Sequence, residues 1–362
     1  MDGITCMDPL THCLLGAVAA QAFFCRRLGR LAPLIGAVAG GLADVDVLIN
    51  IPGDAIQTMM YHRHFTHALL VIPLGGFLAA LPFLWIRKLR YRRPAVIGAA
   101  TLAYGLHGLL DALTSYGTML FWPFSDHRIA LDWMPIVDPI CTFILLAAMI
   151  IGLVKIHPTI GRVGMILTVL YICIGAAQHE RAMTIQKYLA DTRQHKFERS
   201  RVLPTPGNLV VWRSIYEVNG RVYADAIRIP YQGDPSYRQG ESGRLFSAKQ
   251  LPKDFPGSRQ DRDLKTFLWF SDNWLAFVPD RQGFASPLLD MRYTYTPEGL
   301  IARWGIQLQV DKPSEPVELV VPHPPREGLL GDLFDDVFRG ESNGRAFGKL
   351  PPMPTTDDPF EE

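Results

Sequence analysis

Long apolar runs alternate with short charged loops up to about residue 177, and the pattern then changes. Six segments of this first part approach the roughly 20 apolar residues that a helix needs to cross a bilayer core. The third contains no Asp, Glu, Lys or Arg, whereas the first two are weaker and are expected to be partial or re-entrant. We therefore expect a membrane α-helical bundle of about five to six membrane helices over residues 1–177. The six segments are residues 9–25, 31–51, 67–86, 95–113, 139–156 and 163–177.

From residue 178 onward the sequence is rich in proline, glycine and charge, as in water-facing domains. Residues 209–218 and 221–229 flank Asn219-Gly220, a pair that favours the tight turn of a β-hairpin. The expected order is a charged connecting helix at 178–200, a small β-rich extramembrane domain at 201–339 and a disordered tail at 340–362. Further strands are expected at residues 266–270, 274–278, 291–295 and 301–310.

Basic residues in the loops between the apolar segments predict the orientation. One set of alternate loops carries ten Lys and Arg residues, and the other set carries two. The rich set is residues 26–30, 87–93 and 155–162, and the poor set is residues 52–66 and 114–138, which hold Arg63 and Arg128. Because basic loops stay in the cytoplasm, we expect the N-terminus and the C-terminal domain on the outer, periplasmic side of a bacterial inner membrane.

The overall composition argues against two further features, a nucleic-acid partner and a disulfide framework. The net charge of +1 argues against a nucleic-acid partner, which would require a basic stripe. All five cysteines lie in the apolar part, so no disulfide framework supports the C-terminal domain.

Histidines and aspartates interrupt the apolar segments. An Asp at the centre of a membrane helix costs roughly 2.5–3.5 kcal/mol on insertion scales, so such residues usually have a function. The predicted topology places eight of them at one level, the outer membrane interface. Imidazole and carboxylate groups together are typical ligands of hydrolytic zinc and related metal sites. The eight residues are His12, Asp44, Asp46, His62, His64, His67, His107 and Asp111.

Two pairs among them have the spacing of helix neighbours. His107 and Asp111 are four residues apart and share a helix face. His64 and His67 are three apart and would face together on a helix. The first pair could instead be a structural interhelical contact, and the second could be solvated loop histidines. We favour metal ligation for both pairs.

More than one interpretation is open for each of the other candidates. Asp44 and Asp46 would lie on nearly opposite faces of a regular helix, so both reach one site only if the helix ends or unwinds there. We expect Asp44 as a ligand, and Asp46 either as a ligand or, like His62, as a general base; alternatively, both aspartates mark a helix end in water. His12 follows a helix start and is either a ligand or an interfacial residue.

The order and spacing of these motifs over residues 8–155 resemble those of a known family. The matching elements are Thr11-His12-xxx-Gly16, Leu42-Ala-Asp-x-Asp46, His62-Arg63 before His64-x-Thr66-His67, and His107-xxx-Asp111 followed by Gly117. The family is the LexA-regulated, membrane-bound metal-dependent hydrolases (YdjM/YbcI-like), which is distantly similar to zinc-dependent phospholipase C and to fungal zinc single-strand nucleases.

This resemblance implies hydrolase chemistry and a set of metal ligands. The implied ligands are His107 and Asp111, with Asp44 or Asp46, His64 or His67, and His12. A further His-xxx-Glu ligand pair of those enzymes has no match after Asp111. We therefore expect one or two divalent ions, with zinc as the expected metal.

These observations predict a metal-dependent hydrolase that acts on a phosphoester or a lipid-linked phosphate at the outer face of the inner membrane. An ion or metal transporter would also use intramembrane Asp and His, but its path must cross the bilayer. The cytoplasmic halves of the apolar segments carry almost no ionisable residues. A third hypothesis is a non-catalytic scaffold whose C-terminal domain binds a partner.

Overall fold

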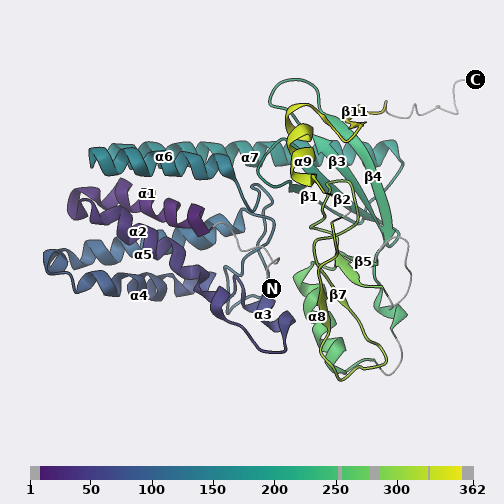
Figure 1. The fold of residues 1–362 in the computed structure, drawn as a ribbon, viewed down its shortest axis with the longest axis horizontal. Coiled ribbons are helices and arrows are strands. Elements are labelled where there is room, and N and C mark those ends of the chain that lie inside the picture. Colours follow the sequence, from purple (N-terminus) through teal and green to yellow (C-terminus); the bar gives the residue numbers. More distant parts are fainter. Residues whose placement is uncertain (1–8, 252–254, 278–285, 325–326, 353–362) are drawn as a thin grey trace, which may run out of the picture. The chain divides into compact units, whose positions relative to one another are not determined.

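The computed structural model describes residues 9–251, 255–277, 286–324 and 327–352 (Figure 1). Its contacts divide the chain into two units. The helical unit contains the chain up to Ala177 together with Pro206–Asn208, and the sheet unit contains Gln178–Thr205 and the chain from Leu209 onward.

Helices build most of the helical unit. Its long elements are α1 (Pro9–Leu28), α2 (Leu31–Leu42), α4 (Ile72–Leu84), α5 (Arg93–Ala112), α6 (Pro139–Lys155) and the first part of α7 (Pro158–Thr192). The short ones are α3 (Ala55–Tyr61) and the 3-10 helices η1 (Ala43–Leu48), η2 (Phe65–His67), η3 (Leu69–Val71) and η4 (Arg87–Arg92). A non-helical segment at residues 113–138 joins α5 to α6.

Small residues allow α1, α2 and α5 to pack closely around one another. Alanines dominate their shared core, including Ala20, Ala39 and Ala99. Gly16 of α1 and Gly36 of α2 lie so close that a Cβ atom on either would collide with the carbonyl oxygen of the other. Such contacts are typical of membrane helices, which associate through close packing of small residues.

Three helices in the described residues are long and apolar enough to cross a membrane: Leu31–Leu48, Arg87–Ala112 and Pro158–Thr192. A fourth span results if Ala55–His67 and Leu69–Leu84, which meet at a 55° bend, count as one. The structure therefore supports three to four spans, whereas the sequence predicted five to six. The difference arises because α1 carries polar residues through its length and the apolar α6 has only 17 residues.

Two larger antiparallel sheets and one two-stranded antiparallel sheet lie in the described part of the sheet unit. The larger has the order β1-β2-β3-β4-β11, with β1 (Arg199–Pro204), β2 (Val211–Val218), β3 (Arg221–Arg228), β4 (Ser236–Arg244) and β11 (Gly348–Lys349). The smaller has the order β5-β6-β7-β8, with β5 (Leu275–Phe277), β6 (Leu288–Asp290), β7 (Gly305–Gln307) and β8 (Glu318–Val320). The remaining elements are η5 (Ala248–Gln250), α8 (Arg259–Phe270), α9 (Leu329–Phe338), β9 (Glu341–Ser342) and β10 (Arg345–Ala346).

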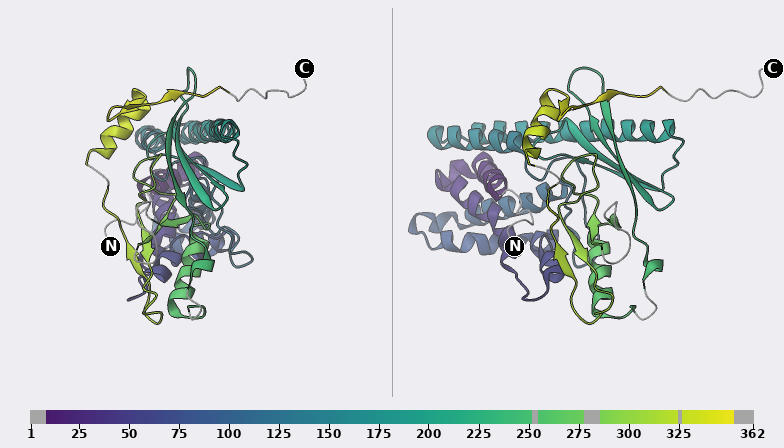
Figure 2. Two further views of the ribbon diagram at one scale, coloured as in Figure 1. Left: turned by 90° about the vertical axis from the view of Figure 1, so that its right-hand side faces the viewer. Right: turned by 45° about the vertical axis from the view of Figure 1, so that its right-hand side comes forward.

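The second part of α7 belongs to the sheet unit and runs along the larger sheet (Figure 2). Gln186 donates hydrogen bonds to the carbonyl oxygens of Arg201 and Ile215, at 2.9 and 3.1 Å. Helix α7 therefore continues to Thr192, within the range predicted for a connecting helix.

The predicted hairpin is confirmed. Strands β2 and β3 pair in register from Val218 and Arg221 outward, and Asn219 and Gly220 have φ values of 51° and 71°. These positive values are those that a type I′ turn requires.

Other strand predictions were partly wrong. Residues 266–270 belong to α8, whose buried Leu264, Phe267 and Phe270 follow the three-residue spacing of a helix face. Residues 291–295 are not a strand, because β6 ends at Asp290. The predicted strand at 301–310 is reduced to β7, and that at 274–278 is β5, with Val278 outside the described residues.

The tail also differs from the prediction of disorder. Residues 341–349 contain β9, β10 and β11, and β11 pairs with β4 through Gly348 and Tyr237. The exposed edge of β4 supplies the hydrogen-bonding partners that the tail sequence cannot provide by itself. Residues 353–362 lie outside the described residues.

Candidate metal centre

Four of the predicted residues meet inside the helical unit. Asp44 lies on η1, His67 ends η2, and His107 and Asp111 lie in the last two turns of α5. One ligand atom from each of the four lies within 4.8 Å of all the others. The two histidines and Asp111 are buried, and Asp44 is partly exposed. We call this group the four-residue cluster.

The two imidazole Nε2 atoms are at the centre of the cluster. His67 Nε2 lies 3.0 Å from His107 Nε2 and 3.0 Å from Asp111 Oδ2. His107 Nε2 lies 3.3 Å from Asp44 Oδ1 and 3.4 Å from Asp111 Oδ2. Two nitrogens and two carboxylates from three separate segments are thus directed at one point.

The hydrogen bond of His107 sets its tautomer. Its Nδ1 lies 2.5 Å from the carbonyl oxygen of Gly40, in the last turn of α2. A carbonyl oxygen can only accept, so Nδ1 carries the proton. In the neutral ring, Nε2 then has a free lone pair directed into the cluster.

A hydrogen-bond relay from His67 through Thr66 to Asp46 sets the tautomer of His67 in the same way. The Thr66 hydroxyl donates to Asp46 Oδ2 at 2.9 Å and lies 2.9 Å from His67 Nδ1. Because the hydroxyl proton is directed at Asp46, Nδ1 of His67 must be the donor to Thr66. The Nε2 lone pair of His67 therefore also points into the cluster.

Two neutral imidazoles arranged in this way repel each other. When both rings are neutral, the two lone pairs face each other across 3.0 Å and neither Nε2 has a proton to share. Both oxygens of Asp44 are buried and accept no hydrogen bond from the described residues. A cation between the four residues would satisfy all these groups, and an N/O donor set suits a divalent transition metal. The residues therefore fit a divalent metal ion, without indicating which one.

Asp46 and His62 are not members of the four-residue cluster, but Asp46 contacts both His62 and His67. The Asp46 carboxylate accepts from the backbone N of Arg63 at 2.8 Å and from Thr66, and lies 3.2 Å from His62 Nδ1. These contacts make Asp46 the support of His67, as carboxylates commonly support metal-ligating histidines.

His64 is separated from His67. Helical spacing would bring the two together, but Arg63 adopts a left-handed conformation with φ of 56°, and a 3-10 turn begins at Phe65. The His64 ring instead contacts Tyr61 and Trp122, with ring centroids 5.7 and 5.5 Å away. The four-residue cluster does not include His64.

His12 contacts the cluster from α1. Its Nε2 lies 3.0 Å from Asp111 Oδ1, and its ring stacks on His107 with centroids 3.8 Å apart. His12 thus contacts Asp111 Oδ1, whereas His67 and His107 contact Oδ2. It therefore packs against two members of the four-residue cluster, Asp111 and His107.

The main residue that sequence reasoning missed is Arg63. Its side chain is completely buried, and its Nε lies 3.4 Å from Asp111 Oδ2. Its NH1 donates to Thr114 Oγ1 at 3.1 Å. The available signal was an arginine between two histidines, in a loop (residues 52–66) that contains no other Lys or Arg.

Charge is unbalanced around the cluster. Asp44, Asp46 and Asp111 contribute three negative charges, and Arg63 contributes one positive charge. With neutral histidines the group has a net charge of −2, and one divalent cation would balance it.

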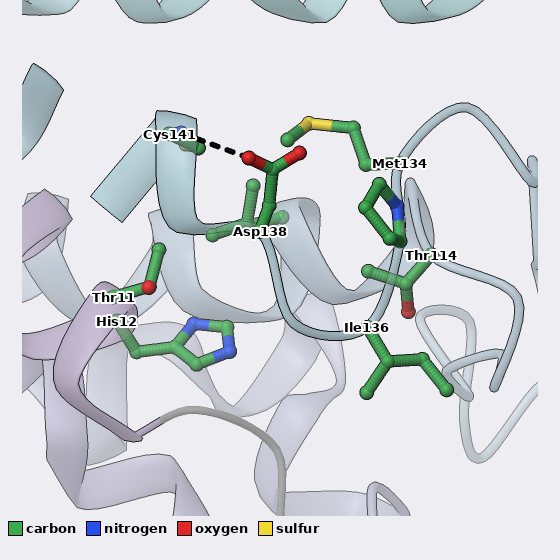
Figure 3. Close-up of a pocket in the computed structure, with 9 residues that line it drawn as sticks. Thr11, His12, Thr114, Met134, Ile136, Asp138 and Cys141 are labelled. Atoms are coloured by element: carbon green, nitrogen blue, oxygen red, sulfur yellow. Dashed lines mark hydrogen bonds between the residues drawn. The ribbon is translucent and has the colours of Figure 1, made fainter. Parts of the chain in front are cut away.

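An open hollow adjoins the cluster on the side of His12 (Figure 3). His12 and Thr114 connect it to the cluster, since each also contacts Asp111 or Arg63. Asp138 at its edge caps α6 by accepting from the backbone N of Cys141 at 2.9 Å. The lining residues are Thr11, His12, Leu110, Thr114, Met134, Pro135, Ile136, Asp138 and Cys141.

Apolar spanning helices and a buried cluster of imidazoles and carboxylates define a membrane protein with a candidate metal centre. Residues 7–182 match the family described as YdjM inner membrane protein, and this range contains all the cluster residues. The match agrees with the resemblance to YdjM-like membrane proteins that the motifs indicated. Neither the curated proteins nor the solved structures compared with the chain gave a significant match.

Proposed function

We propose that this protein is a membrane-bound, metal-dependent hydrolase of phosphoesters or lipid-linked phosphates. Asp44, His67, His107 and Asp111 would hold the metal. The observation that carries the proposal is the 3.0 Å approach of the two Nε2 atoms, whose lone pairs face each other. A metal cation between these atoms would turn that repulsion into attraction and would engage Asp44 and Asp111 at the same time.

The charge of the site and its ligand types bear on the metal. With neutral histidines the net charge of −2 would be balanced by one divalent ion, so a second ion would have to enter with an anion such as the substrate. Two imidazoles and two carboxylates suit zinc, and they also suit manganese or iron. We propose one resident ion, with zinc as the first metal to test.

When bound, such an ion supplies a Lewis acid that polarises a phosphoryl oxygen and activates water for attack. The protein's own residues orient this site. Gly40 holds His107, the Asp46–Thr66 pair holds His67, and His12 holds Asp111. His62, backed by Asp46 and less buried than the cluster, is the proposed proton acceptor.

The substrate class is proposed from the surroundings of the cluster. Leu110, Met134, Pro135 and Ile136 line the hollow beside His12, and these apolar side chains are the proposed contacts for the hydrocarbon part of a lipid at its mouth. The loop charges support a site and a C-terminal domain on the outer side of the inner membrane.

The experiment is metal analysis of the purified full-length protein in detergent. We expect about one divalent ion per chain, and its loss in His107→Ala and Asp111→Asn. The matched control is His157→Ala, because His157 is exposed and far from the cluster in sequence. Full metal content in both cluster variants would refute the site.

Activity is measured with phospholipid and phosphomonoester substrates on the same preparations. Hydrolysis should follow metal content and disappear with the His107→Ala variant. If the protein binds metal and hydrolyses none of these substrates, but transports the ion into liposomes in a His107-dependent manner, it is a carrier and the hydrolase proposal is wrong.

A further inference from the structure

A buried guanidinium lies beside the candidate metal centre with unused hydrogen-bonding capacity. Arg63 is fully buried, yet its Nε and NH2 make no hydrogen bond with the residues that the structure describes. The polar contacts of its guanidinium include the NH1 bond to Thr114 and the 3.4 Å approach of Nε to Asp111. Leaving charged donors unsatisfied in a buried place is costly, so these groups suit a partner that arrives with the substrate.

The fold fixes this side chain firmly. The backbone of Arg63 is held from both sides, because its N donates to Asp46 and its carbonyl oxygen accepts from the N of Met119 at 3.3 Å. Its guanidinium lies over the ring of Tyr116, with Cζ 4.7 Å from the ring centroid. A φ of 56° is unfavourable for an arginine, and it directs the side chain toward Asp111 rather than outward.

A second arginine adds positive charge at the same place. The guanidinium of Arg128 lies over Tyr116 as well, 4.9 Å from the ring centroid. It donates to the carbonyl oxygens of Tyr116 and Gly117, at 3.3 and 2.8 Å. Arg63 and Arg128, the two basic residues of loops 52–66 and 114–138, thus converge on one tyrosine.

We propose that Arg63 binds a phosphoryl oxyanion of the substrate, next to the metal held by Asp111. The inference rests on the proposed function. A guanidinium presents its N–H groups as a planar fork that matches two oxygens of a phosphate. The hollow is the side from which the ligand would approach Arg63, because Thr114 lines the hollow and accepts from Arg63 NH1.

The test measures binding of inorganic phosphate by the metal-loaded, full-length protein in detergent, by calorimetry. The variants are Arg63→Gln, which keeps a donor for Thr114 but removes the charge, and Arg63→Lys, which keeps the charge but removes the fork. The matched control is Arg87→Gln, because Arg87 is exposed on η4. Metal content is determined for every sample.

We expect Arg63→Gln to keep its metal and to bind phosphate at least tenfold more weakly. Arg63→Lys should fall between this variant and the wild type, and Arg87→Gln should bind as the wild type does. The same measurement with dioctanoyl phosphatidic acid identifies the source of the oxyanion. If Arg63→Gln weakens the binding of both ligands, the oxyanion belongs to a lipid headgroup. If it weakens the binding of phosphate alone, the oxyanion belongs to a soluble phosphate ester.

Phosphate affinity within twofold of the wild type in metal-loaded Arg63→Gln would overturn the inference and leave the metal proposal intact. Loss of metal in both Arg63 variants would also overturn it, because Arg63 would then only hold Asp111 in place. Absence of metal from the wild type would instead refute the proposed function. If Arg63→Gln does not fold, Arg63→Lys is the test. Unchanged phosphate affinity in Arg63→Lys would contradict the proposed contact of a planar guanidinium with two phosphate oxygens.

Discussion

At the scale of single residues, the candidate centre depends on which nitrogen of each histidine carries the proton. Gly40 and Thr66 each accept an N–H from a different ring, and both rings therefore direct Nε2 at the same point. Glycine and threonine are not residues that a search for metal-ligand motifs would include. The orientation of the ligands is thus set by a backbone carbonyl and a threonine hydroxyl.

Removal of the Thr66 hydroxyl tests this relay. In Thr66→Val, Nδ1 of His67 loses its acceptor and Asp46 loses a donor, so we expect metal affinity to fall by about 10–100-fold, as for other residues that support ligands. Thr66→Ser retains the hydroxyl and should stay near the wild type. Competition with a chelator of known affinity gives the measurement, and equal affinities in Thr66→Val and the wild type would contradict the relay.

At the scale of elements, the contact between α1 and α2 places His12 beside α5. Gly40 has no side chain, and a Cβ atom there would collide with the carbonyl oxygen of His12. Gly16 and Gly36 allow the same close approach one turn further along. The Thr11-His12-xxx-Gly16 motif therefore combines a residue of the site with the glycine that brings its helix into place.

Substitution of Gly36 by alanine tests this contact. The added methyl group has no space, because it meets the backbone of Gly16, so we expect a loss of about 1–3 kcal/mol, as for overpacked cores. The control is Gly331→Ala in α9, where a Cβ atom meets nothing within 4 Å. Thermal unfolding in detergent measures both variants, and equal melting temperatures would show that the helices can separate without cost.

The hairpin of the sheet unit offers a second test at this scale. Gly220 has a φ of 71°, a conformation that costs roughly 1–2 kcal/mol for a residue with a side chain. Gly220→Ala should therefore destabilise the sheet unit by about this amount, whereas Asn219→Gly should change little. Denaturant unfolding monitored by tryptophan fluorescence compares the two, and the prediction fails if Gly220→Ala unfolds at the same midpoint as the wild type.

At the scale of the whole molecule, the candidate centre ties together segments that are far apart in the chain. Asp44, His67 and Asp111 lie on three different elements, and His12 adds a fourth. A cation bound among them links these elements in the folded state only. The metal should therefore contribute to the stability of the helical unit as well as to its chemistry.

Removal of the metal tests this linkage. A ligand at 100 times its dissociation constant stabilises the folded state by about 2.7 kcal/mol. A chelator should accordingly lower the melting temperature of the wild type, and re-addition of the metal should restore it. The Asp111→Asn variant should show no response to either treatment, and an equal response in both proteins would place the stabilising ion elsewhere.

The sequence alone determined the features that depend on neighbouring residues. Apolar run length predicted a helical membrane part, and Asn219-Gly220 predicted the hairpin because its turn requires positive φ values. The residue types able to bind a metal were also visible. Local pattern was insufficient at residues 266–270, where apolar spacing fits a strand or a helix, and in the tail, whose strand β11 requires the distant edge of β4.

Only the tertiary structure decided which candidates meet. His67 joins the cluster and His64 does not, because the backbone of His64 is non-helical, with φ of −92° and ψ of −121°, just before η2 begins at Phe65. Arg63 itself becomes part of the site only when Asp111 and Tyr116 surround it. Ligand convergence depends on how α1, α2 and α5 pack, and glycine contacts between helices set that packing. These contacts join residues distant in the chain, so no local pattern records which side chains they bring together.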